Sequence, residues 1–122
     1  MFQANVALLN SFLQTRLRLV VTYGNTEYDD LPGNNKTNGE YLNDLIMDNN
    51  RTFSSVFSKR ESVSAHVVFL IAKNVPSGKA SAIGVDTKYP TAGFAVVKRK
   101  RSDWDYILTH ELGHLLVSLF IY

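Results

Sequence analysis

The sequence predicts a single α/β domain, with a mixed, mostly parallel twisted sheet, an antiparallel edge strand and packed helices. Three observations support this fold class. The 122 residues and their 45% hydrophobic content suit one small soluble domain. Segments with helical periodicity alternate with β-rich segments, which is the order typical of strands joined by helices. The segment Ala65–Ala72 is an almost continuous apolar run, which favours a strand buried on both faces.

The first forty residues are expected to form a helix, a strand and a loop. Apolar residues spaced three and four apart predict an amphipathic helix over about residues 3–16. Leu17–Tyr23 follows with a composition that predicts a strand. The polar segment Gly24–Gly39 contains the turn-forming Pro32-Gly33 pair, so we expect an exposed loop there.

The middle of the chain is expected to hold a helical region and the buried strand. Thr37 and Glu40 have the spacing of a capping box, which marks the beginning of a helix. Apolar residues continue the helical region to about Lys59. The buried strand at Ala65–Ala72 then follows.

The last third is expected to contain two strands and a helix. A turn at Pro76–Gly78 precedes a weaker strand around Lys79–Val85, and Gly93–Lys100 forms another strand. Ser102 is a suitable cap for a final helix. The predicted order is therefore helix, strand, helix, strand, edge strand, strand, helix.

The final helix carries the main functional motif, His110-Glu111-Leu112-Gly113-His114, which has the pattern H-E-x-x-H. Two histidines four residues apart lie one helical turn apart on one face, where their imidazoles can bind one Zn²⁺. The glutamate between them can reach a metal-bound water, whose pKa zinc lowers to about 7. The motif predicts His110 and His114 as metal ligands and Glu111 as the catalytic general base. The alternative is a surface helix that carries these residues without a function.

With this motif the chain resembles the metzincin zinc peptidases, and within them the reprolysin (adamalysin-like) group. The resemblance covers about residues 4–116. Residues 65–70 look like the buried strand of that family, residues 78–84 like its edge strand, and residues 93–97 like the strand before the motif helix. The resemblance implies the upper subdomain of a metzincin-like catalytic domain, with Zn²⁺ as cofactor and a secreted or extracellular location.

The resemblance also implies where a substrate binds. A peptide or protein substrate would lie antiparallel to the edge strand and add a strand to the sheet by main-chain hydrogen bonds. The substrate-binding residues would then be Lys79, Ala80, Ser81, Ala82 and Ile83. Gly113 is expected to let the motif helix pack closely against its neighbours.

The sequence departs from the family after His114. The metzincin motif continues as H-E-x-x-H-x-x-G-x-x-H, but Val117 and Phe120 stand at the positions of the glycine and the third histidine. Phenylalanine cannot bind zinc, so the third ligand is missing and we expect weak zinc binding and low activity. Residues 1–122 are accordingly interpreted as one incomplete metallopeptidase-like catalytic domain. The alternative function is a non-catalytic peptide-binding or decoy fragment of a metallopeptidase.

The composition disfavours other functions. A net charge of +2 is too small to indicate a nucleic-acid partner, and the basic run Lys98–Arg101 is interpreted as a solvated strand end. The apolar segment Leu115–Tyr122 is shorter than the roughly 20 residues of a membrane span. Without cysteine, cysteine catalysis is excluded. His66 is interpreted as a structural histidine, and the oligomeric state is left open.

Overall fold

The computed structural model describes residues 2–10, 16–22, 24, 28, 32–33, 35–47, 53–81, 93–99 and 104–116. This part of the chain forms four helices: α1 (Phe2–Asn10), α2 (Asn38–Met47), α3 (Ser54–Ser62) and α4 (Trp104–Leu116). It also forms three strands: β1 (Val68–Ala72), β2 (Gly78–Ala80) and β3 (Phe94–Lys98). The predicted mixed α/β class is therefore confirmed at this level. None of these helices has the length and apolar character that crossing a membrane requires.

The three strands form one mixed sheet in the order β1-β3-β2. β1 and β3 are parallel, with Val68 opposite Phe94, whereas β2 is antiparallel to β3, with Gly78 opposite Val97. The antiparallel edge strand predicted from Lys79 onward is thus confirmed for its first residues, and the strand begins one residue earlier, at Gly78. β3, which comes last in the sequence, lies in the middle of the sheet.

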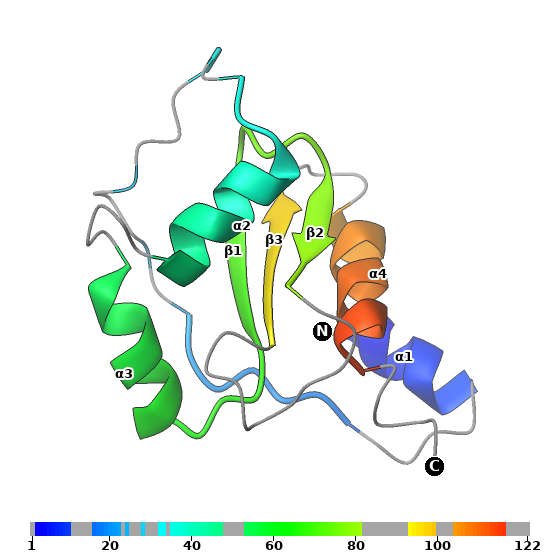
Figure 1. Cartoon of the computed structure of the whole chain (residues 1–122). Coiled ribbons are helices and arrows are strands. Elements are labelled where there is room, and N and C mark those ends of the chain that lie inside the picture. Colours follow the sequence, from blue (N-terminus) through cyan, green and yellow to red (C-terminus); the bar gives the residue numbers. More distant parts are fainter. Residues whose placement is uncertain are drawn as a thin grey trace.

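Helices lie on both faces of the sheet, and Figure 1 shows α2 crossing in front of β1 and β3 while α4 runs alongside β2. Side chains alternate between the faces of a strand. Phe94 and Val96 belong to the core that α2 contributes to, so Ala95 and Val97 face α4. Phe69, which is paired with Ala95, accordingly packs beside Leu112 of α4.

The larger core lies between the sheet, α2 and α3. Its buried members are mainly aromatic and branched aliphatic residues: Tyr41, Leu42, Leu45, Phe53, Val56, Ala72, Val75, Phe94 and Val96. The ring centroids of Phe57 and Phe94 lie 5.1 Å apart, which joins α3 to β3. α2 therefore presents its apolar stripe to the sheet, as its periodicity indicates.

The strand that is buried on both faces is β3, which corrects the expectation for residues 65–72. Only residues 68–72 of that run form a strand, and Ile71 is 43% exposed. Phe94, Ala95, Val96 and Val97 are each 0% exposed. The reason is the strand order: β1 lies at an edge of the described sheet, and β3 has a strand on each side.

The predicted strand at Leu17–Tyr23 is wrong for residues 17–22, which are irregular, and Tyr23 lies outside the described residues. The Leu17 N–H donates to Asn5 Oδ1 at 2.8 Å, and Asn5 Nδ2 donates to the Leu17 carbonyl oxygen at 3.0 Å. The backbone of Leu17 thus finds its partners on a side chain of α1 instead of on a strand. The predicted helix is confirmed over residues 3–10; residues 11–15 lie outside the described ranges, and Arg16 is not helical.

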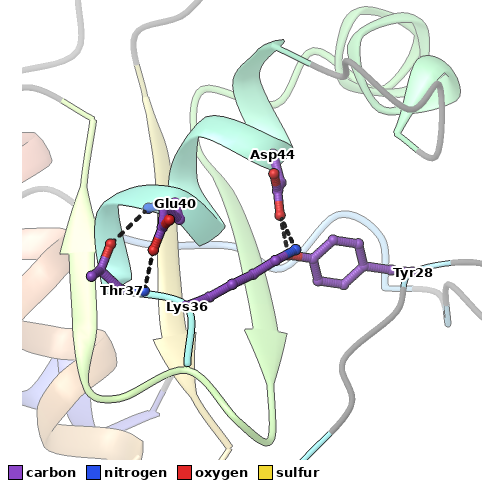
Figure 2. Close-up of polar contacts among 5 residues, drawn as sticks. All are labelled: Tyr28, Lys36, Thr37, Glu40 and Asp44. Atoms are coloured by element: carbon purple, nitrogen blue, oxygen red, sulfur yellow. Dashed lines mark hydrogen bonds and ion pairs between the residues drawn. The ribbon is translucent and has the colours of Figure 1, made fainter. Parts of the chain in front are cut away.

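The capping box at the beginning of α2 is confirmed (Figure 2). The Thr37 N–H donates to Glu40 Oε2 at 2.7 Å, and the Glu40 N–H donates to Thr37 Oγ1 at 3.2 Å. The backbone hydrogen bond from Thr37, and after it one from the Thr37 side chain, lower the pKa of the Glu40 carboxyl below its ordinary value. The expected continuous helical region instead contains two helices, α2 ending at Met47 and α3 beginning at Ser54; Phe53 lies in a turn, and residues 48–52 lie outside the described ranges.

Next to the capping box, Asp44 fixes the segment that precedes α2. Its Oδ2 accepts a hydrogen bond from the Tyr28 hydroxyl at 2.8 Å and forms an ion pair with Lys36 Nζ at 2.7 Å (Figure 2). The Lys36 ammonium also lies 5.3 Å from the centre of the Tyr28 ring. Lys36 and Tyr28 are thereby tied to one carboxylate on α2.

We expect Thr37→Ala to lower the free energy of unfolding by about 1 kcal/mol, because it removes the side-chain oxygen that accepts the Glu40 N–H. Thr37→Ser keeps that oxygen and should have nearly the stability of the unchanged chain. Urea unfolding followed by circular dichroism measures both. Equal losses in the two variants would show that the hydroxyl contributes nothing.

At the other end of the sheet, Arg60 of α3 holds the segment before β1. Its Nε donates to the Ala65 carbonyl oxygen at 3.1 Å, and its Nη2 donates to the His66 carbonyl oxygen at 2.8 Å. The guanidinium carbon lies 4.9 Å from the centre of the Phe94 ring. Burial lowers the pKa of Arg60. Gly93, the residue directly before β3, lies beside this Arg60 contact and has a φ of +80°.

Candidate metal site

α4 places the motif on the side of the sheet opposite α2. Leu108, Leu112 and Leu115 are buried and form the apolar stripe by which the helix packs. At 3.6 residues per turn, Glu111 lies on the flank of this stripe, and His110 and His114 lie further round toward solvent. The motif is therefore on a helix, as predicted, with Glu111 on the buried side and His110 and His114 at the surface.

The two motif histidines lie close together. Their Nε2 atoms are 3.0 Å apart and share a hydrogen bond, their ring centroids are 4.6 Å apart, and the ring planes meet at 89°. Both side chains are exposed. Two nitrogens bound to one tetrahedral Zn²⁺ at the usual bond length would lie about 3.3 Å apart. The pair therefore has a spacing that suits one shared metal ion.

Glu111 differs from the histidines because it is only 6% exposed. It is a charged residue type on the buried side of α4, and it lies against β2. A Cβ placed on Gly78 would be 2.9 Å from Glu111 Oε1 and 2.8 Å from Ile107 Cγ2. A side chain at position 78 would therefore require the Glu111 and Ile107 side chains to shift. The sequence did not predict this contact between Gly78 and Glu111. The one sequence feature that could have indicated it is a glycine at the start of the weak strand.

The expectation for Gly113 is wrong. Its backbone is exposed, and no described atom lies within 4 Å of the position that a Cβ would take. The close approach between α4 and the sheet is instead made at Gly78, which belongs to β2 and faces the helix. Gly113 instead leaves open space beside His110, its neighbour one turn earlier on the helix surface.

The structure describes three of the five residues expected to bind substrate. Lys79 and Ala80 lie in β2 and Ser81 follows it, while Ala82 and Ile83 lie outside the described residues. Within the described sheet, β2 has a strand on one side only. The Ser81 N–H donates to the Phe94 carbonyl oxygen at 2.7 Å, so Ser81 faces β3. The expected edge position is confirmed for Lys79 and Ala80 within the described sheet.

The hydrogen-bond pattern shows which residues of β2 offer their backbone to the open edge. The Lys98 N–H donates to the Ser77 carbonyl oxygen at 2.7 Å, which places Ser77, like Ser81, in a bonded pair with β3. Bonded and non-bonded pairs alternate along an antiparallel ladder. Lys79 is therefore bonded to β3, and Gly78 and Ala80 direct their N–H and C=O groups outward.

In the part of the chain that the structure describes, the other candidate groups do not add to the histidine pair. Among the described residues, no group of three or more histidine, cysteine, aspartate or glutamate side chains is placed to hold a metal ion. Val117 and Phe120 lie outside the described part of the chain. His66, interpreted as structural, precedes β1 with an exposed side chain. A depression of about 440 Å³ involves none of these residues; it is lined by Gly33, Asn35, Lys36, Thr37, Asn74 and Pro76.

The motif thus lies on a helix, with two neighbouring imidazoles and, between them in the sequence, a buried glutamate that contacts β2. Comparisons of the chain with protein-family models, curated proteins and solved structures find no match.

Proposed function

We propose that the chain is the zinc-binding part of a metalloendopeptidase related to the metzincins, and that α4 carries its metal ligands and its general base. The observation that carries the proposal is the 3.0 Å separation of the His110 and His114 Nε2 atoms, with Glu111 between them in the sequence and against β2 in space. This donor set is chemically suited to Zn²⁺, because imidazole nitrogen is a common ligand of catalytic zinc. The fold supports the same proposal, since the motif helix packs beside an antiparallel edge strand.

The chain's own residues have distinct roles in this proposal. His110 and His114 would hold the metal ion through Nε2. When bound, Zn²⁺ supplies a Lewis acid that polarises a carbonyl group and acidifies water. Glu111 would accept a proton from the attacking water at its carboxylate and pass that proton to the leaving amine. Its burial against Gly78 would hold the carboxylate in one orientation beside the bound peptide.

β2 would position the peptide. An extended peptide lying antiparallel to β2 would form main-chain hydrogen bonds with Gly78 and Ala80, whose backbone groups point outward. Lys79, which is paired with Val96, would contribute its side chain instead of its backbone. The Glu111 carboxylate touches the same strand, so the peptide bond to be cleaved would lie near the base. A secreted or extracellular location belongs to the same proposal.

Zinc binding and zinc-dependent cleavage test this function. We expect metal-free chain to take up Zn²⁺ in equilibrium dialysis, weakly because two imidazoles bind less tightly than three ligands, and to cleave a mixture of unfolded peptides slowly when zinc is present. His110→Ala and His114→Ala should lose both properties. His66→Ala is the matched control, because it removes the third histidine of the sequence and leaves α4 unchanged.

The result also separates the two candidate functions. Cleavage that a chelator stops supports the endopeptidase. Peptide binding that persists in the chelated chain and is not followed by cleavage favours the non-catalytic peptide-binding fragment, for which the open edge of β2 is the supporting observation. A chain that takes up no zinc and binds no peptide would overturn both candidate functions.

A further inference from the structure

The histidine pair of α4 is open to a second molecule. Both imidazoles are exposed, whereas Glu111 beside them is buried. Gly113, three residues after His110, adds no side chain to this surface, and no described atom lies within 4 Å of the place where one would begin. Another polypeptide can therefore reach the two Nε2 atoms without displacing a described side chain.

One chain supplies only part of a closed zinc site. Zn²⁺ that is held by protein alone takes four ligands in a tetrahedral arrangement. Two imidazoles from each of two copies complete this set, and a twofold axis through the metal makes the contact the same for both copies. We infer that Zn²⁺ held by His110 and His114 joins two copies of this chain, the second copy contributing the same pair. The inference rests on the zinc binding in the proposed function, not on its catalysis.

Electrostatics also favour a second copy as the occupant. Four neutral imidazoles leave both positive charges of the metal ion uncompensated. Each copy carries one Glu111 on the flank of α4 next to the histidines, directed toward β2, so two copies bring two acidic residues to the pair of bridged helices.

The bridged dimer would be an inactive form of the proposed enzyme. Catalytic zinc sites keep one position open for water or substrate, and four protein ligands close that position. Dissociation of the dimer would return the open site.

Titration of the metal-free 122-residue chain with zinc sulfate tests the inference, with the mass measured by sedimentation equilibrium and the bound metal by elemental analysis. We expect the mass to double at one zinc ion per two chains and to return to that of the monomer with a chelator. His110→Ala and His114→Ala should remain monomeric, and His66→Ala should form the dimer. Gly113→Leu, which keeps both ligands and raises helix propensity, should bind zinc as a monomer because its side chain blocks the approach.

The outcomes distinguish this inference from the function on which it rests. One zinc ion on each monomer overturns the bridged dimer and leaves the proposed zinc site standing. A dimer that forms without zinc, or that persists in His110→Ala, also overturns the bridge. No zinc bound to any form overturns both the inference and the proposed function. Circular dichroism of the metal-free variants verifies that each one is folded.

Discussion

Glu111→Gln is expected to lower zinc-dependent peptide cleavage by about 10²–10⁴-fold, which is the usual contribution of a general base. Glutamine has nearly the shape of glutamate, so it can occupy the same buried position against Gly78. Its amide cannot accept the proton of the attacking water. Zinc affinity should change little, because His110 and His114 supply the ligands. Initial rates and zinc dialysis on the same samples measure both effects.

The matched control is Glu61→Gln, which makes the same chemical change at an exposed position of α3. Its cleavage rate should equal that of the unchanged chain. If Glu111→Gln retained full cleavage, Glu111 would be a structural residue of the interface between α4 and β2. If Glu111→Gln lost zinc together with activity, the carboxylate would be assigned to the metal instead of to proton transfer.

Gly93→Ala is expected to lower the free energy of unfolding by about 3 kcal/mol, because strain and collision act together. Gly93 has φ +80°, which side chains disfavour. A Cβ at this position would collide with the carbonyl oxygen of His66 and lie 3.0 Å from Nη2 of Arg60. It would thus disturb both the Arg60 contact and the hydrogen bond from the Val68 N–H to the Gly93 carbonyl oxygen. Urea unfolding measures the loss.

Gly33→Ala separates the two causes. Gly33 has nearly the same backbone conformation, with φ +79°, but nothing lies within 4 Å of the position of its missing Cβ. This variant should lose only about 1 kcal/mol, the cost of the left-handed conformation. The difference between the two variants then measures the collision near His66. Equal losses would mean that this region rearranges freely and that Arg60 does not fix it.

Local signals in the sequence predicted local structure well. The capping box at Thr37 and Glu40 is made by residues three apart, so its spacing alone is sufficient. The motif helix was predicted for a similar reason, since α4 carries its own periodicity. The prediction of a strand at residues 17–22 was wrong because β propensity indicates only that a segment is suited to a sheet. It does not show that a partner strand is present, and the Leu17 backbone binds the Asn5 side chain instead.

Relations between distant segments were not readable in the same way. The order β1-β3-β2 decides which strand is enclosed, and both β1 and β3 have apolar sequences. The contact between Gly78 and Glu111 joins residues that are far apart in the chain, and a glycine has no side chain to indicate its partner. A packing role was predicted for Gly113 because this residue lies inside the motif. In the structure, its position on the helix faces solvent.

A second, smaller core lies on the face of the sheet opposite α2, and it can form only after α4 has been synthesised. On the face opposite α2, Leu112 of α4 covers Leu17, Val67 and Phe69, so residues from the beginning and the end of the described chain meet there. The core on the α2 side is complete once β3 has been made. A nascent chain that still lacks α4 therefore exposes one apolar face of a sheet whose other face is already covered. That exposed apolar face is covered once the helix carrying the histidines has been made and has packed on it.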